Sequence, residues 1–187
     1  MTARRGANAV EPIRELKKIK ELKTYLRQRS YRDYFLFIFG INSGLRISDI
    51  LPLRVIDVKY AKYLKIREKK TGNFRKTIIS ETLKNEIEKY TEKMADNDYL
   101  FPSKKGDKPI SRMQAWQIIH DAALVCRIEG PIGTHTLRKT FGYHFYQRTK
   151  DVAMLQQIFG HSSPSITLRY IGINGDMMDK ALEKFSL

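Results

Sequence analysis

The sequence is poor in cysteine and has no long apolar run. Cys126 is the only cysteine among the 187 residues, which excludes an internal disulfide and is typical of proteins in a reducing compartment. It stands within an apolar helical pattern, so we interpret it as a core residue. No stretch is long and apolar enough to cross a membrane, and residues 1–8 lack the apolar centre of a secretory signal. These absences predict a cytoplasmic protein without a membrane partner.

Acidic residues are also in deficit. The chain has 35 lysines and arginines against 20 aspartates and glutamates, which gives a formal net charge of +15. So large a positive charge indicates a polyanionic partner, either a nucleic acid or an anionic membrane surface. A solvated, lysine-rich surface would give the same charge. No long amphipathic helix with a wide apolar face is predicted, which disfavours the membrane surface and leaves nucleic acid as the expected partner.

The apolar spacing predicts an α+β fold, mainly helical with a small antiparallel sheet. Hydrophobic residues make up 42% of the chain, enough for an ordinary core, and the length suits one domain. We expect a flexible basic N-terminus over residues 1–10 and one domain over residues 11–187. Helical patterns cover residues 13–26, 34–41, 81–94, 111–125 and 174–185. Thr134 and Asp151 are expected to cap further helices, and Ser163-Pro164 starts the segment that bears Tyr170. Strand-like patterns cover residues 55–58, 63–66 and 77–79.

Six residues in a fixed order could carry a reaction at a phosphate. They share side chains that bind phosphate, move protons or attack phosphorus. They are Arg46 in Gly44–Asp49, Lys70 at a Lys-Thr-Gly-Asn turn, His135 and Arg138 in His-Thr-Leu-Arg, His161 in Phe-Gly-His, and Tyr170 nine residues later. Arginine stays protonated and offers a planar fork to phosphate. A tyrosine hydroxyl can form a covalent phosphotyrosine, and lysine or histidine can protonate a leaving oxygen.

Taken singly, each of these residues also has an ordinary structural interpretation. Arg46 could pair with a helix C-terminus, Lys70 could be a solvated hairpin lysine, and Tyr170 could belong to the core. His135 and Arg138 are three residues apart, so a helix would place both on one face and within reach of one phosphate. The order of all six favours the chemical interpretation.

That order resembles the catalytic domain of the tyrosine recombinase, or phage integrase, family over about residues 13–185. Gly-Leu-Arg-Ile-Ser-Asp at residues 44–49 is similar to the family's first arginine box. His-Thr-Leu-Arg-Lys-Thr-Phe at residues 135–141 is similar to its His-x-x-Arg box. Phe-Gly-His-Ser-Ser at residues 159–163 and Thr-Leu-Arg-Tyr at residues 167–170 are similar to its final box. Lys139 departs from the pattern, because histidine is frequent at that position.

The resemblance implies a role for each residue and requires no cofactor or metal. The implied roles are phosphate binding by Arg46 and Arg138, proton transfer by His135, protonation of the departing 5′ oxygen by Lys70, a hydrogen bond to phosphate from His161, and attack by Tyr170 to form a 3′-phosphotyrosyl link. Asp49 matches a supporting acidic position. Lys69 is a neighbouring alternative to Lys70 for the acid; we prefer Lys70 because it directly precedes the Thr-Gly turn.

The implied function is site-specific DNA recombination: integration, excision or inversion of DNA through strand cleavage and rejoining. The implied partners are double-stranded DNA and a homotetramer on synapsed sites, with a monomer possible without DNA. The main alternative is a catalytically inactive DNA-binding module of the same fold, and a further one is a type IB topoisomerase-like relaxing enzyme. The length leaves no room for the N-terminal core-binding domain of many members, so we expect either a catalytic domain alone or a short member similar to the fimbrial-switch recombinases.

Overall fold

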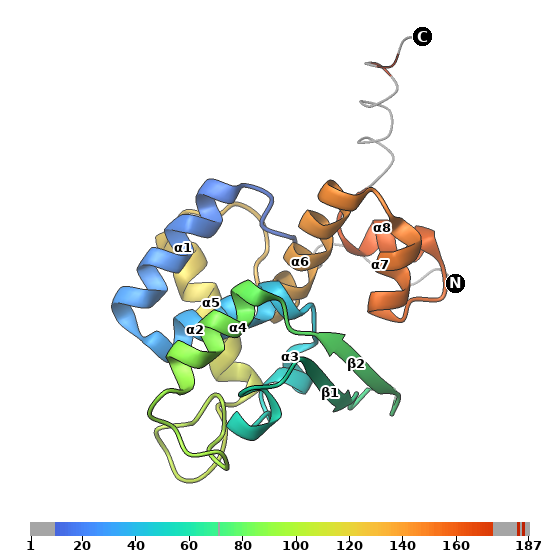
Figure 1. Cartoon of the computed structure of the whole chain (residues 1–187). Helices are drawn as coiled ribbons and strands as arrows, with labels where there is room; N and C mark the ends of the chain where they lie inside the picture. Colours follow the sequence, from blue (N-terminus) through green and yellow to red (C-terminus); the bar gives the residue numbers. More distant parts are fainter. Residues whose placement is uncertain (1–9, 71, 174–182, 184, 186–187) are drawn as a thin grey trace, which may run out of the picture.

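The protein folds as a mainly helical domain with one β-hairpin (Figure 1). The computed structural model describes residues 10–70, 72–173, 183 and 185. Its elements are α1 (Leu16–Arg29), α2 (Tyr31–Ser43), α3 (Ile47–Ile50), the 3-10 turn η1 (Val55–Asp57), β1 (Tyr63–Arg67), β2 (Phe74–Ile78), α4 (Glu81–Thr91), α5 (Arg112–Val125), α6 (Thr134–Thr149), α7 (Val152–Phe159) and α8 (Pro164–Tyr170). The predicted fold class is confirmed.

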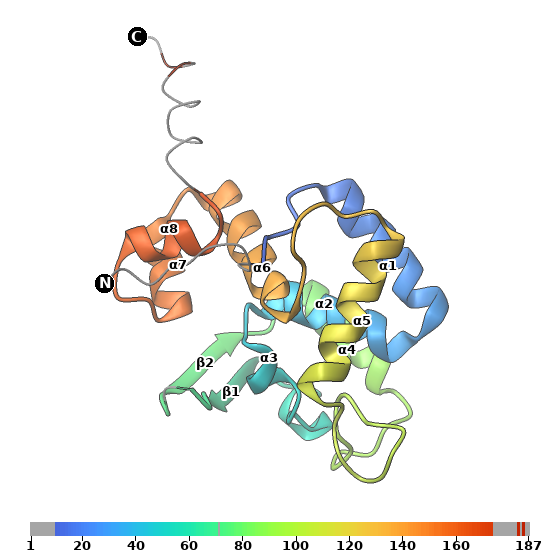
Figure 2. The ribbon, with the colours of Figure 1, turned by 180° about the vertical axis from the view of Figure 1, so that it is seen from behind.

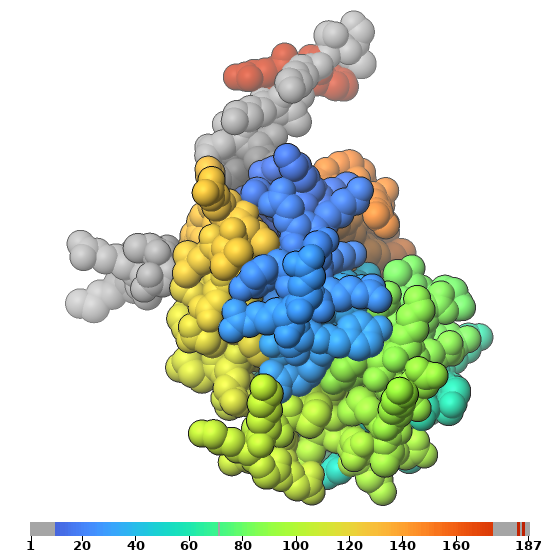
Figure 3. Space-filling model, turned by 90° about the vertical axis from the view of Figure 1, so that its left-hand side faces the viewer, coloured from blue at the N-terminus to red at the C-terminus, as the bar shows by residue number. Residues whose placement is uncertain are grey.

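Helix α2 forms the centre of the main core because almost its whole sequence is apolar. Its residues from 33 to 40 are buried, and Phe35 stacks on Phe101 with ring centroids 5.7 Å apart. Helix α1 packs on it through Ile19, Leu22 and Leu26, the apolar positions predicted from the helical spacing. The space-filling view shows α1, in blue, between α5, in yellow, and α4, in green (Figure 3).

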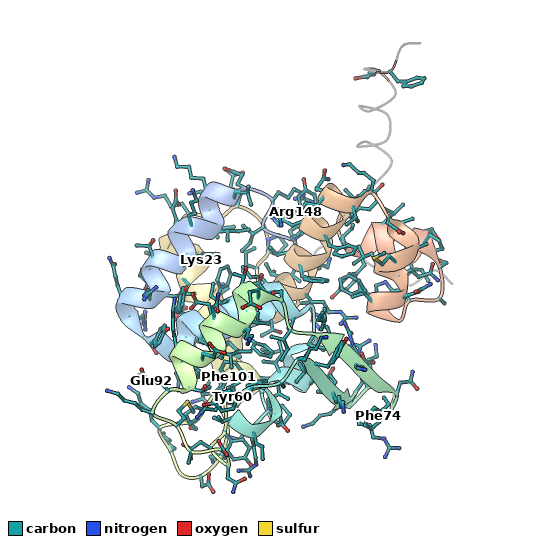
Figure 4. The ribbon with its side chains drawn as sticks, in the orientation of Figure 1. Lys23, Tyr60, Phe74, Glu92, Phe101 and Arg148 are labelled. Atoms are coloured by element: carbon teal, nitrogen blue, oxygen red, sulfur yellow. The ribbon has the colours of Figure 1, made fainter. Side chains whose placement is uncertain are left out.

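The hairpin of β1 and β2 is antiparallel and leaves one face open. Leu64 pairs with Thr77 and Arg67 pairs with Phe74, and Gly72 supplies the positive φ of 71° that the turn requires. The Phe74 side chain is 78% exposed, in contrast to the buried Phe101 (Figure 4). The predicted strands at residues 63–66 and 77–79 are therefore present, but β2 begins three residues earlier than predicted, at Phe74.

The strand predicted over residues 55–58 is wrong, since this segment forms the 3-10 turn η1. The carboxylate of Asp57 accepts a hydrogen bond from the Arg54 amide at 2.8 Å, which closes the segment into a turn. The Val55 and Ile56 amides donate to carbonyls of the loop at residues 96–98. These two amides are thus bonded to a loop and not to a neighbouring strand of a sheet.

The helix caps follow the sequence at most positions. Ser111 and Asp151 each accept a hydrogen bond from an amide in the first helical turn, as predicted, and Ser163 does the same at the start of α8. Thr134 is not a cap: Gly133 takes that position. A side chain there would lie only 3.2 Å from Val10 and 3.3 Å from Trp116, so these neighbours would have to shift to admit one.

The buried apolar residues form two clusters that share helix α6. The larger cluster is built on α1, α2, α4 and α5 and includes Leu137 of α6. The smaller one joins α7 and the chain after α8, through Leu155, Phe159, Ile171 and Ile173, and packs on Phe141 and its neighbours in α6. Both ribbon views show α7 and α8 beside α6, on the side away from α1 (Figures 1 and 2).

Among the described residues, no helix has the length and hydrophobicity needed to cross a membrane. The flexible segment expected over residues 1–10 falls, apart from Val10, outside the described residues. The helix expected over residues 174–185 also lies outside them, apart from Glu183 and Phe185.

Candidate active site

Arg46 is placed by the sharp end of helix α2. Gly44 has a φ of 61° and ends that helix, and a side chain there would meet the Phe141 ring at 2.5 Å. The chain therefore turns at once into Arg46, the N-cap of α3. The Arg46 guanidinium forms an ion pair with the Glu68 carboxylate at 2.8 Å and lies 3.9 Å from the Asp49 carboxylate.

The Glu68 carboxylate bridges two arginines. Its second oxygen accepts a hydrogen bond from Arg75 of β2 at 3.3 Å, and Glu68 itself is 8% exposed. Burial lowers the pKa of Arg75, although the hydrogen bond and charge of Glu68 oppose that change. Asp49 accepts a hydrogen bond from the Lys69 amide at 3.0 Å. These contacts fix the turn end of the hairpin to the first arginine box.

Arg138 is buried between the ends of two helices. Its guanidinium donates to the Gly44 carbonyl at 2.6 Å and to the Phe159 carbonyl at 2.9 Å. It also lies 4.3 Å from the centroid of the Phe159 ring. Burial lowers the pKa of Arg138 to about 10, so the side chain remains a cation at neutral pH.

A pocket of about 290 Å³ opens between the first arginine box, the hairpin and the start of α6. Its lining residues are Arg46, Ile47, Ser48, Lys69, Lys70, Arg112 and His135. Lys69 and Lys70 are both exposed. Partial burial, with the charges of Arg112 and Arg138 next in size, lowers the pKa of His135. The pocket is strongly cationic, which suits an anion such as a phosphate.

Tyr170 and His161 reach the same region from the small cluster. The Tyr170 hydroxyl lies 3.5 Å from His135 Nδ1, and the Tyr170 ring packs edge-on against His161 with centroids 5.1 Å apart. Burial raises the pKa of Tyr170, while the charges of Arg138 and Arg46 oppose that rise. Tyr170 is therefore a neutral phenol at neutral pH.

His161 is held as a neutral ring. Its Nδ1 is 3.0 Å from the Thr167 hydroxyl. Burial, together with the charges of Arg138, Arg46 and Lys70, lowers the pKa of His161 to about 4.

The structure brings together all six residues that the sequence singled out. Arg46, Lys70 and His135 line the pocket, Tyr170 and His161 lie against each other, and Arg138 is buried beneath them. Sequence reasoning missed Glu68, Arg75 and Arg112 in this region, and it did not place Lys139 in the interior. Strand alternation could have found the first two, because both lie beside the predicted turn.

Comparisons with known proteins agree with this arrangement. A family model described as the phage integrase family matches residues 14–176. The probable integrase/recombinase YoeC of Bacillus subtilis (strain 168) is 60% identical, and the match covers 94% of this chain and 97% of YoeC. Tyrosine recombinase XerA of Pyrococcus furiosus is 27% identical over 90% of this chain, and the match spans 60% of XerA.

The fold is also similar to that of a solved recombinase structure. The crystal structure of XerA recombinase superposes with a TM-score of 0.76 at 22% sequence identity, and the match covers 100% of this chain and 68% of that one. The family match covers most of the chain, from the first helix to beyond Tyr170. The chain therefore belongs to the phage integrase family and is a tyrosine-type site-specific recombinase that breaks and rejoins DNA.

Proposed function

We propose that Tyr170 is the nucleophile of this recombinase and that Arg46, Arg138, His135, His161 and Lys70 serve the scissile phosphate. The observation that carries the proposal is the position of the Tyr170 hydroxyl, 3.5 Å from Nδ1 of His135, a residue that lines the cationic pocket. The same Tyr170 ring packs against His161. A phosphate in the pocket would lie between the nucleophile and the arginine side chains.

The proposed reaction exchanges one phosphodiester for another. The Tyr170 oxygen attacks phosphorus and forms a bond to it, while the bond from phosphorus to the 5′ oxygen breaks. His135, kept neutral by its lowered pKa, can accept the phenol proton. Lys70 gives a proton to the 5′ oxygen, and the product is a 3′-phosphotyrosyl link. Attack by a 5′ hydroxyl from another strand reverses these steps and joins the new partners.

The two arginines supply electrostatic stabilisation in this proposal. Negative charge grows on the non-bridging oxygens as the tyrosine attacks, and preorganised cations in a partly dry site stabilise that charge more than water does. Glu68 orients Arg46, and two main-chain carbonyls orient Arg138. The arginines are therefore in place before DNA binds. His161 is the proposed hydrogen-bond donor to the phosphate from the side of the small cluster.

The proposed substrate is duplex DNA carrying a specific site, and the proposed assembly is a homotetramer on two synapsed sites, with a monomer in the absence of DNA. The proposed compartment is the cytoplasm. A net charge of +15 predicts that DNA binding weakens steeply as salt rises, because bound cations release counterions from the backbone. Mass photometry tests the assembly: the protein alone should have the mass of a monomer, and the protein with DNA should include a complex of four chains and two sites.

The test of the nucleophile is covalent trapping on a nicked DNA site followed by a denaturing gel. Wild type should give a protein–DNA adduct, and Tyr170→Phe should give none while still binding the site in a gel shift. Tyr146→Phe, a change to a partly buried tyrosine in α6, is the matched control and should retain the adduct. DNA binding without any wild-type adduct would instead support the inactive DNA-binding module.

The role of Lys70 as the general acid can be tested with DNA whose leaving group does not need to be protonated. A bridging sulfur at the 5′ position leaves as a thiolate, which is far more acidic than an alcohol. Lys70→Ala should therefore slow cleavage of normal DNA strongly and cleavage of the sulfur-substituted DNA little. Lys69→Ala is the control. If only Lys69→Ala shows this difference, the acid is Lys69 rather than Lys70.

A further inference from the structure

The segment Val10–Arg14, here called the strap, crosses helix α6 and is fixed to it. The Ile13 amide donates to the Thr140 hydroxyl at 2.9 Å, in the interior. The Ile13 carbonyl is 2.9 Å from His144 Nε2, and the Glu11 amide donates to the Pro131 carbonyl at 2.8 Å. Hydrogen bonds on both sides of Ile13 thus hold the strap against α6.

The strap also contacts the chain directly after Tyr170. Arg14 donates to the Gly172 carbonyl at 3.4 Å, and the Glu11 carboxylate holds Arg14 through an ion pair at 2.7 Å. A side chain at Gly172 would lie 2.6 Å from the Arg14 guanidinium and 3.2 Å from the Glu11 carboxylate. Gly172 has a φ of 77°, so the backbone conformation favours glycine here, and a larger residue would push the Arg14 guanidinium away. The strap therefore packs against Gly172, two positions after Tyr170.

Lys139 approaches Tyr170 from the same direction. Its ammonium lies 5.2 Å from the centroid of the Tyr170 ring, within the range of a cation–π interaction. Lys139 is only 9% exposed. Burial lowers its pKa, and the charges of Glu11 and Arg14 act on it in opposite directions. Lys139 and the strap thus form one group of charges beside the nucleophile.

We propose that Lys139 and the strap form a clamp that positions Tyr170, with Lys139 holding the ring and Arg14 holding the main chain at Gly172. This inference deepens the proposed function, and it rests on Tyr170 being the nucleophile. Lys139 and Arg14 are positioning residues, because neither is among the groups assigned to the phosphate. Their contribution is to keep the hydroxyl beside His135, so that attack does not first require the α8 segment to dock.

The first test measures the exposure of Tyr170 without DNA. N-acetylimidazole acetylates accessible tyrosine hydroxyls, and peptide mass spectrometry reads each tyrosine separately. Lys139→Met keeps the length of the side chain and removes its charge, and should raise the acetylation rate of Tyr170 by about threefold to tenfold, the size expected from one partly desolvated cation–π contact. Lys139→Arg retains the cation and should restore most of the protection.

The matched control removes a lysine at the end of the same helix that also lies near a tyrosine ring. Lys150, just after α6, lies 5.6 Å from the ring of Tyr146 and is exposed. Lys150→Met removes one positive charge, as Lys139→Met does, and should leave Tyr170 acetylation unchanged. Thermal unfolding of each variant, followed by circular dichroism, identifies any that fails to fold.

The second test uses Arg14→Gln, an exposed change that spares the core, with Arg27→Gln on α1 as its control. Arg27 also lies over tyrosine rings, at 5.6 and 5.4 Å. Arg14→Gln should raise Tyr170 acetylation and slow single-turnover adduct formation by a similar factor, with DNA affinity equal to that of Arg27→Gln. This variant tests the clamp even if Lys139→Met is unstable.

The results separate the clamp from the chemistry. Unchanged Tyr170 acetylation in both Lys139→Met and Arg14→Gln would overturn the clamp. If acetylation rises in the variants but wild type forms no adduct on nicked DNA, the clamp holds Tyr170 and the proposed nucleophile is wrong. If acetylation rises and adduct formation does not slow, the clamp does not position the tyrosine for attack, and the inference fails.

Discussion

Replacing Arg138 with lysine should weaken the fold as well as the reaction. The guanidinium bonds two carbonyls from different helix ends, those of Gly44 and Phe159. Lysine has one compact ammonium in place of a planar fork, so it can reach one carbonyl well and leaves the other without its donor. Because the Arg138→Lys variant keeps the positive charge, the main change is the loss of a hydrogen bond to one of the two carbonyls.

The magnitude follows from the two hydrogen bonds. A hydrogen bond from a charged donor contributes about 1.5–3 kcal/mol, and an unsatisfied buried carbonyl costs a similar amount. Loss of one bond, with some relaxation around the lysine, should lower the free energy of unfolding by about 2–4 kcal/mol. For a chain of this length that corresponds to a fall in Tm of about 5–15 °C.

Urea unfolding measures this change directly. Trp116 is the only tryptophan in the sequence, so its fluorescence reports on α5, and circular dichroism reports on all helices. Arg169→Lys, a change to an exposed arginine of α8, is the control and should stay within about 0.5 kcal/mol of wild type. A change of less than about 0.5 kcal/mol in Arg138→Lys, with an unchanged m-value, would refute the argument from geometry.

Three further outcomes follow from the site. Glu68→Gln removes the carboxylate that orients Arg46, and should slow adduct formation by about tenfold or more with little change in DNA affinity; equal rates would contradict that role. The free energy of unfolding should fall as pH drops from about 6.5 to 4, because His161 has a lowered pKa of about 4 and the unfolded chain then binds the extra proton. His161→Asn should flatten this part of the stability curve. Gly142→Ala would place a methyl 2.7 Å from Ile171, and should lower Tm by displacing the segment after α8, whereas alanine normally stabilises a helix.

Much of this architecture could be predicted from local sequence. The helical spacing of Leu22 and Leu26 located α1, and the Thr-Gly turn located the hairpin. The boxes around Arg46 and His135 identified the site because each box is continuous in the chain. Residues 55–58 were mistaken for a strand because β-branched residues are also found in short turns, and the hydrogen bonds that decide between them come from the loop at residues 96–98.

The contacts that tune the site were beyond sequence reasoning because they join distant segments. Ile13 bonds to Thr140 across 127 residues, and nothing in either local pattern indicates this pair. Lys139 reads as a surface lysine in its helix until the fold places it over Tyr170. The bridging role of Glu68 depends on hairpin register, since a shift of one residue would turn its side chain to the other face.

The two hydrophobic clusters have a consequence for how this enzyme loses activity. Tyr170 packs on the smaller cluster and its ring lies against His161, whereas Arg46 stands between Leu45 and Ile47 of the larger cluster. A unit with so few buried apolar residues opens at a lower free energy than the rest of the domain. Mild denaturant or heat should therefore inactivate the enzyme reversibly before the whole domain unfolds, because the proposed nucleophile would move away from the proposed phosphate-binding residues while these are still folded.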